Sequence, residues 1–158
     1  MTRFSYILND SADTVERKNH DYGSSFANIR DKYGPIAFHV RIADKLARIT
    51  QLNKSEAKVD ESILDTLQDI IGYCTLEIAY CTGEGFRNIL GWELVEDACK
   101  AYDTYKDKRV AYGTEVYKSW LDSSWGMYEN FNNPEYLYTM IKDTAMEIVY
   151  REEVNERG

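Results

Sequence analysis

The stretch DESILDTLQDIIGYCTLEIAY, residues 60–80, decides the fold of this chain. It has the pattern of a helix, yet Glu61, Asp65 and Asp69 recur every four residues along one side and form an acidic row. Like charges at that spacing repel by about 0.2–0.5 kcal/mol per pair, and aspartate is a poor helix former in mid-helix. The stretch therefore predicts a helix that begins at Asp60, together with a source of positive charge for the acidic row.

The rest of the sequence also predicts helices, because no alternating run is long enough to favour a strand. Pro35 and Pro134 each open a helical pattern, and proline suits a first helical turn because its missing N–H has no partner there. The fold class is therefore all-α, an antiparallel helical bundle in a single domain over residues 1–158. Further helices are predicted over residues 11–19, between Gly23 and Gly34, over 35–52, over 88–108 with an interruption near Gly91, over 114–131 and over 133–154, followed by a frayed tail, NERG.

Composition limits the classes of function. The chain has 158 residues, enough to bury roughly two-thirds of its unfolded surface, and 44% hydrophobic residues are too many for a disordered chain. A net charge of −8 argues against direct binding to duplex nucleic acid, which needs a basic surface. It does not argue against small anionic ligands, because a metal ion can bridge a carboxylate site to a phosphate.

Location and redox state are predicted from the same sequence. No segment approaches the roughly 20 apolar residues of a membrane span, and the first residues lack the apolar run of a signal peptide. Three cysteines without a CxxC pair do not indicate zinc. Cys74 and Cys81 lie seven residues apart on one helix, so we expect both to share a face as small core residues. A soluble cytoplasmic protein in a reducing compartment, the host cytoplasm if phage-encoded, is predicted, without a membrane partner.

A mixed basic face precedes the acidic row. Arg41, Asp44, Lys45 and Arg48 follow the spacing i, i+3, i+4, i+7, which places them on one face of the helix over 35–52. The loop between the two helices is short, so they should pack antiparallel, with this mixed face opposite the acidic row.

Two interpretations of the facing charges remain open. In the first, the basic residues pair with the acids in a charge zipper. In the second, the acids hold Mg²⁺ or Mn²⁺ around substrate phosphates, which is how Mg²⁺ is usually bound. Asp69 favours the metal, because it lies more than two turns inside the helix and gains nothing from the helix dipole. A merely solvated face would do better with glutamate, which propagates helix more readily.

Three motifs resemble those of a known family. They are K-x-x-D-Y-G in KNHDYG, R-x-x-D-K-x-x-R in RIADKLAR, and E-S-x-x-D-T-x-x-D in ESILDTLQD with Tyr73 four residues later. In this order they resemble the first of the nucleotide modification associated domain families, found largely in phages and bacteria. The resemblance covers roughly Glu16 to Tyr80. From Cys81 onward the sequence shows no motif of this family and is predicted to be a helical extension, residues 81–158.

That family is similar in layout to the MazG-like all-α nucleoside triphosphate pyrophosphatases. The resemblance implies a MazG-like core with additional C-terminal helices, and a Mg²⁺-dependent pyrophosphohydrolase acting on a (deoxy)nucleoside triphosphate, in phage-type metabolism of modified nucleotides. In that reaction a carboxylate takes a proton from water, which attacks the α-phosphorus while pyrophosphate leaves. The implied roles are metal ligands Asp44, Glu61, Asp65 and Asp69; a catalytic base from Glu61 or Asp65; phosphate contacts from Arg41, Lys45 and Arg48; and closure over the substrate by Lys18, Asp21 and Tyr22.

Other readings remain beside this one. A non-catalytic nucleotide-binding module in a DNA-base modification pathway would bind nucleotides and turn over none, and a purely structural protein would carry the charge zipper. MazG-like helical pairs usually need partner subunits, so a homo-oligomer is expected.

Single residues carry further expectations. His39 is predicted to pack in a partly buried position, and His20 to lie on the surface or in a lid. Tyr73 is expected either to pack or to bond a carboxylate. The aromatic group in the helix over 114–131 is expected in the core, in a subunit interface or against a base; its members are Tyr117, Trp120, Trp125, Tyr128 and Phe131.

Overall fold

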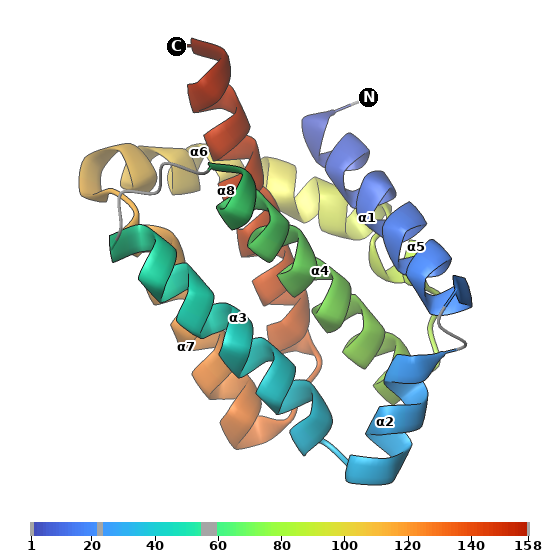
Figure 1. The fold of residues 1–158 in the computed structure, drawn as a ribbon. Helices are drawn as coiled ribbons and strands as arrows, with labels where there is room; N and C mark the ends of the chain where they lie inside the picture. Colours follow the sequence, from blue (N-terminus) through green and yellow to red (C-terminus); the bar gives the residue numbers. More distant parts are fainter. Residues whose placement is uncertain (1, 22–23, 55–59, 158) are drawn as a thin grey trace.

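The computed structural model describes residues 2–21, 24–54 and 60–157, and within these residues the regular structure is entirely helical (Figure 1). The all-α prediction is confirmed. The helices are α1 (Arg3–Asp21), α2 (Ser25–Tyr33), α3 (Ile36–Lys54), α4 (Asp60–Thr82), α5 (Phe86–Ile89), α6 (Trp92–Tyr112), α7 (Glu115–Phe131) and α8 (Glu135–Arg157).

The centre of the bundle is formed by α4 and α8. Helix α8 packs against α1, α4, α6 and α7, and α4 also contacts α1 and α3 (Figure 1). Residues 143–149 of α8 are buried without interruption, as expected for a helix surrounded by others. Among the described residues, no helix is both long enough and apolar enough to cross a membrane.

Two helix ends differ from the prediction, and they lie at one junction between α1 and α8. Helix α1 begins at Arg3 rather than near Ser11, and α8 continues to Arg157, so the NERG tail is helical up to that residue rather than frayed. Arg3 lies 3.3 Å from Glu152 and 2.9 Å from Glu156, which joins the first turn of α1 to the last turns of α8. A pairing across about 150 residues gives no local signal in the sequence.

The predicted breaks at glycines are confirmed. Gly34 ends α2 with a φ of 75°, a conformation that glycine adopts without steric cost, and Pro35 follows directly before α3. The interruption predicted near Gly91 separates α5 from α6. A Cβ at Gly91 would lie 3.0 Å from the carbonyl oxygen of Asn88, so the turn is too tight for a side chain.

The predicted pairing of two cysteines on one core face is half wrong. Cys74 is fully buried, whereas Cys81 is exposed. Seven residues do return to the same side of a helix, but Cys81 lies in the last turn of α4, next to Thr82, where the helix ends. Its Sγ lies 3.7 Å from Glu77. Burial therefore depends on the position along the helix as well as on its face.

Two buried glutamates hold the helices together. Glu77 on α4 accepts from Arg30 Nε at 3.0 Å and Nη2 at 3.2 Å, and from the Tyr128 hydroxyl at 3.1 Å. Arg30 belongs to α2 and Tyr128 to α7, so one carboxylate connects three helices. Glu147 on α8 has a similar role toward α6 and is likewise completely buried.

The carboxyl of Asp143 makes stability depend on pH. Asp143 on α8 is 3% exposed, and no donor among the described residues bonds its side chain. Burial raises the pKa of Asp143 to about 7, although Lys142 opposes the shift. A raised carboxyl pKa favours the protonated form, so the free energy of unfolding falls as pH rises from about 4, the unfolded pKa, to about 7.

We expect Asp143→Asn to remove this pH dependence, because asparagine stays neutral. At pH 3, below both pKa values, the variant and the wild type should be about equally stable. At pH 8 the variant should be more stable by about 1–4 kcal/mol, at roughly 1.36 kcal/mol per pKa unit. Urea unfolding at both pH values measures this difference, and equal stabilities at pH 8 would show that the carboxylate is solvated.

Candidate functional site

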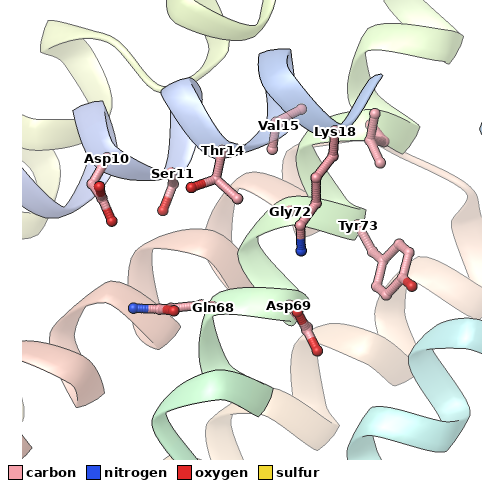
Figure 2. A pocket seen from close by; sticks show the side chains of 10 residues that line it. Asp10, Ser11, Thr14, Val15, Lys18, Gln68, Asp69, Gly72 and Tyr73 are labelled. Carbon is pink, nitrogen blue, oxygen red and sulfur yellow. The ribbon is translucent and has the colours of Figure 1, made fainter. Parts of the chain in front are cut away.

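A pocket of about 140 Å³ lies between α1 and α4 (Figure 2). Figure 2 shows side chains of α1 reaching toward α4, with the α4 residues opposite. This volume is smaller than the roughly 300–1,000 Å³ of sites that bury a whole drug-sized ligand, so the pocket suits a part of a ligand such as a phosphate group. Its lining consists of Asp10, Ser11, Thr14, Val15 and Lys18 from α1, and Gln68, Asp69, Gly72, Tyr73 and Leu76 from α4.

The local sequence explains why the pocket is open and why polar groups line part of it. Ser11, Thr14 and Lys18 follow the spacing i, i+3, i+7, which places two hydroxyls and an ammonium on one side of α1. Gly72 lies in the middle of α4, where glycine costs about 1 kcal/mol relative to alanine. A Cβ there would meet Val15 Cγ2 at 3.7 Å, so the absent side chain leaves the pocket floor open.

Helix α3 approaches the same part of α4 from the other side. Lys45 Nζ lies 3.2 Å from Asp69 Oδ2, and the Lys45 side chain is only 12% exposed. The guanidinium of Arg41 lies over the rings of both Phe26 and Tyr73, 5.4 Å from each centroid. Asp69 and Tyr73 therefore form a wall, with the pocket and Lys18 on the α1 side and two α3 cations behind it.

These contacts confirm the predicted antiparallel packing of α3 and α4. Residue 41 lies opposite residue 73, and residue 45 opposite residue 69, so the numbers run in opposite directions. They also decide between the two expectations for Tyr73: its ring packs beneath Arg41 and Lys45. Cation–π contacts of this kind contribute about 0.5–2 kcal/mol and hold the cations in place.

The wall carries several cations in an acidic protein. Lys18, Arg41 and Lys45 lie on its two sides together with Asp10 and Asp69, although the chain as a whole carries −8. Within the described part of the chain, neither Lys18 nor Arg41 has an ion pair. Most arginines elsewhere do pair with carboxylates, namely Arg3, Arg30, Arg87, Arg109 and Arg151. Two cations that have no ion pair among the described residues, on either side of Asp69 and Tyr73, favour an anionic ligand.

Other predicted site residues lie elsewhere. Asp44 and Arg48 are exposed on α3, and Asp65 is exposed on α4, one turn before Asp69. Tyr22 lies outside the described residues, and so do the side chains of Asp21 and Glu61. The structure thus brings together Lys18, Arg41, Lys45 and Asp69 from the predicted set.

One of the ion pairs that the charge-zipper interpretation predicts between α3 and α4 is present in the described part of the chain, namely Lys45 with Asp69. Among the described residues, no three acidic, histidine or cysteine side chains are placed to share a metal ion. Mg²⁺ is commonly held by one or two carboxylates together with ligand phosphates, and the exposed Asp65 fits that mode.

The histidine and aromatic predictions have clear outcomes. The His39 ring packs edge-on against Trp125, at 5.2 Å between centroids, and against Phe38 and Tyr128, so the partly buried packing role is confirmed. His20 is exposed, as predicted. Of the aromatic group on α7, Tyr117, Trp125 and Tyr128 are buried in the core, Trp120 packs partly buried against it, and Phe131 is 64% exposed.

Several pocket residues were not anticipated from the sequence. They are Asp10, Ser11, Thr14, Gln68 and Gly72. The row of small polar residues on α1 and a glycine in the interior of a helix were the available signals, since each weakens a helix unless something else requires it. The pocket itself depends on α1 crossing α4, and that crossing has no local signature.

One comparison with known proteins gives a match. Residues 18–79 match the family described as Nucleotide modification associated domain 1. No curated protein and no solved structure matches the chain. The matched segment begins at Lys18 and includes Arg41, Lys45, Asp69 and Tyr73, the residues that surround the wall between α1 and α3. The resemblance found in the sequence is thus confirmed over residues 18–79 of the 158, which match this nucleotide modification associated domain family.

Proposed function

We propose that the protein binds a nucleotide through its phosphates at the wall formed by Asp69 and Tyr73. The observation that carries this proposal is a pair of cations without an ion pair in the described structure: Lys18 in the lining of the pocket, and Arg41 over the ring of Tyr73. The match of this segment to a family described by nucleotide modification supports the choice of anion.

The chain's own groups suit a phosphate. Hydrogen bonds between a cation and a phosphate are about twice as strong as neutral ones, and an arginine can bind two phosphate oxygens at once. Arg41 is held by two aromatic rings, so little side-chain freedom is lost on binding. Ser11 and Thr14 add hydroxyl donors inside the pocket. Lys45 can remain with Asp69 and keep that carboxylate from repelling the ligand.

A second candidate, nucleotide pyrophosphohydrolase, is favoured by Asp65. Its carboxylate is exposed, one turn from Asp69, and has no ion pair with a described residue. Mg²⁺ bound with the nucleotide would neutralise phosphate charge and activate water. In this reaction Asp65 would accept a proton from the attacking water, while Lys18 and Arg41 would stabilise charge that develops on the phosphate oxygens.

One pair of measurements tests both candidates. Titration calorimetry with a panel of (deoxy)nucleoside triphosphates should show binding, and release of pyrophosphate in the presence of Mg²⁺ should show whether turnover accompanies it. If the protein is a hydrolase, Asp65→Asn should abolish turnover while the variant remains folded. Asp107→Asn, an exposed aspartate on α6, should leave turnover unchanged.

The outcomes separate cleanly. Binding without turnover would support the non-catalytic nucleotide-binding function. Binding with turnover that depends on Asp65 would establish the hydrolase. Absence of binding for every nucleotide, with and without Mg²⁺, would remove both candidates and leave a structural role for the Lys45–Asp69 pair.

A further inference from the structure

Helix α3 has a second apolar face that no described residue covers. Its inner face carries Phe38, Ile42 and Ile49, which are completely buried. On the opposite side Ile36 is 57% and Val40 60% exposed, and the exposed Ala43 and Ala47 continue the row. We call Ile36, Val40, Ala43 and Ala47 the outer stripe.

The outer stripe has the spacing of a helix–helix seam. Its intervals are four, three and four residues, which is the alternation that a coiled-coil partner recognises. Single exposed aliphatic side chains are common on protein surfaces, but four apolar positions in this register along three turns form a continuous strip. The two alanines are small, so a second helix can approach closely at that point.

One edge of the outer stripe carries two charges of opposite sign. Asp44 and Arg48 are exposed on the side of α3 nearer to α4. They lie four residues apart on the same helix, yet they form no ion pair with each other or with another described residue. Both are therefore available to a partner at this face.

The order of these charges is self-complementary. In an antiparallel pair of helices related by a twofold axis, the same edge of each helix meets the same edge of the other. Asp44 then lies beside Arg48 of the partner subunit, and the twofold axis generates a second ion pair of the same kind. Ala43 lies near the partner subunit's Ala47. A parallel pair of helices would not form these two ion pairs, because residues of the same number would then lie at the same level.

We propose that the outer stripe of α3 binds the same stripe of a second copy of this chain, in an antiparallel twofold pair fixed by two Asp44–Arg48 ion pairs. This specifies the surface for the homo-oligomer expected from the sequence. It is independent of the proposed nucleotide function, because Arg41 and Lys45 face α4 and stay uncovered.

Sedimentation velocity over a range of micromolar concentrations tests the interface. The wild type should be a dimer, and Val40→Glu should weaken it by about tenfold or more, since it buries a charge in the seam. Val110→Glu is the matched control: Val110 is 66% exposed on α6, outside the stripe, and the dimer should persist. Val40→Glu should still bind nucleotide, which keeps this test distinct from that of the nucleotide site.

The two Asp44–Arg48 ion pairs between the subunits are tested separately. Asp44→Arg and Arg48→Asp should each weaken the dimer, because each places like charges opposite one another. The double variant restores opposite signs and should recover the dimer. A wild type that remains monomeric, a dimer unaffected by Val40→Glu, an equal loss with Val110→Glu, or a double variant weaker than both single variants would overturn the proposal.

Discussion

Replacing both Lys18 and Arg41 by glutamine is expected to weaken nucleotide binding by about 10²–10⁴-fold. Each substitution removes a charge-assisted hydrogen bond to phosphate, worth about 1.5–3 kcal/mol, and every 1.4 kcal/mol changes the affinity tenfold. The two side chains lie on α1 and α3, on either side of Asp69 and Tyr73, so their contributions should be roughly additive. Titration calorimetry with the best-bound nucleotide measures the loss.

Arg17→Gln is the matched control for this experiment. Arg17 is the neighbour of Lys18 on α1 and is exposed, but it does not line the pocket and has no ion pair with a described residue. Its replacement removes the same charge and should change the affinity little. If Arg17→Gln weakens binding as much as Lys18→Gln, the ligand responds only to the general charge of α1. Thermal melts check that Arg41→Gln, which loses contacts with Phe26 and Tyr73, remains folded.

Glu147→Gln is expected to lower the free energy of unfolding by about 3–5 kcal/mol, the usual cost of breaking a buried ion pair. The completely buried carboxylate of Glu147 accepts from Arg109 Nε at 2.9 Å and Nη2 at 3.0 Å, and from Arg151 Nε at 2.6 Å. It also accepts from the hydroxyl of Tyr105, whose pKa is raised chiefly by burial. A neutral amide cannot compensate the guanidinium of Arg109, whose side chain is only 8% exposed. Equilibrium unfolding in urea measures the effect.

Two further variants test the reason for that loss. Glu96→Gln breaks an exposed pair with Lys100 on α6 and should cost less than about 1 kcal/mol. The double variant Arg109→Met with Glu147→Met removes both buried charges and should recover part of the stability, because apolar replacements of buried pairs are often well tolerated. If Glu147→Gln costs no more than Glu96→Gln, water must reach the Glu147 site.

Much of the candidate site could be predicted because its residues repeat at helical spacing. Their separation of four residues places Arg41 and Lys45 on one face of α3, and the acidic row places Asp69 on the facing helix. In the structure, Lys45 pairs with Asp69. The antiparallel packing followed from a short connection. The pocket did not follow, because it needs α1 beside Gly72, and the two are about 60 residues apart in the sequence.

Burial was the feature that periodicity predicted least well. Cys74 and Cys81 have the same helical phase, yet only Cys74 is buried. Glu147 and Asp143 are both acids near the middle of α8 and are both buried, but Glu147 meets two arginines and Asp143 meets no described donor. A sequence gives the angular position of a side chain, whereas the neighbouring helices decide what surrounds it.

The sequence by itself determined the all-α class, the breaks at Gly34 and Gly91, and the family that residues 18–79 match. These depend on local backbone preferences and on residue spacing, which operate within a few turns. The tertiary structure alone decided that Lys18 and Arg41 flank one wall, that α1 and α8 are joined at Arg3, and that the described residues leave one face of α3 uncovered. These depend on contacts between distant segments, whose geometry is fixed only when the whole core packs.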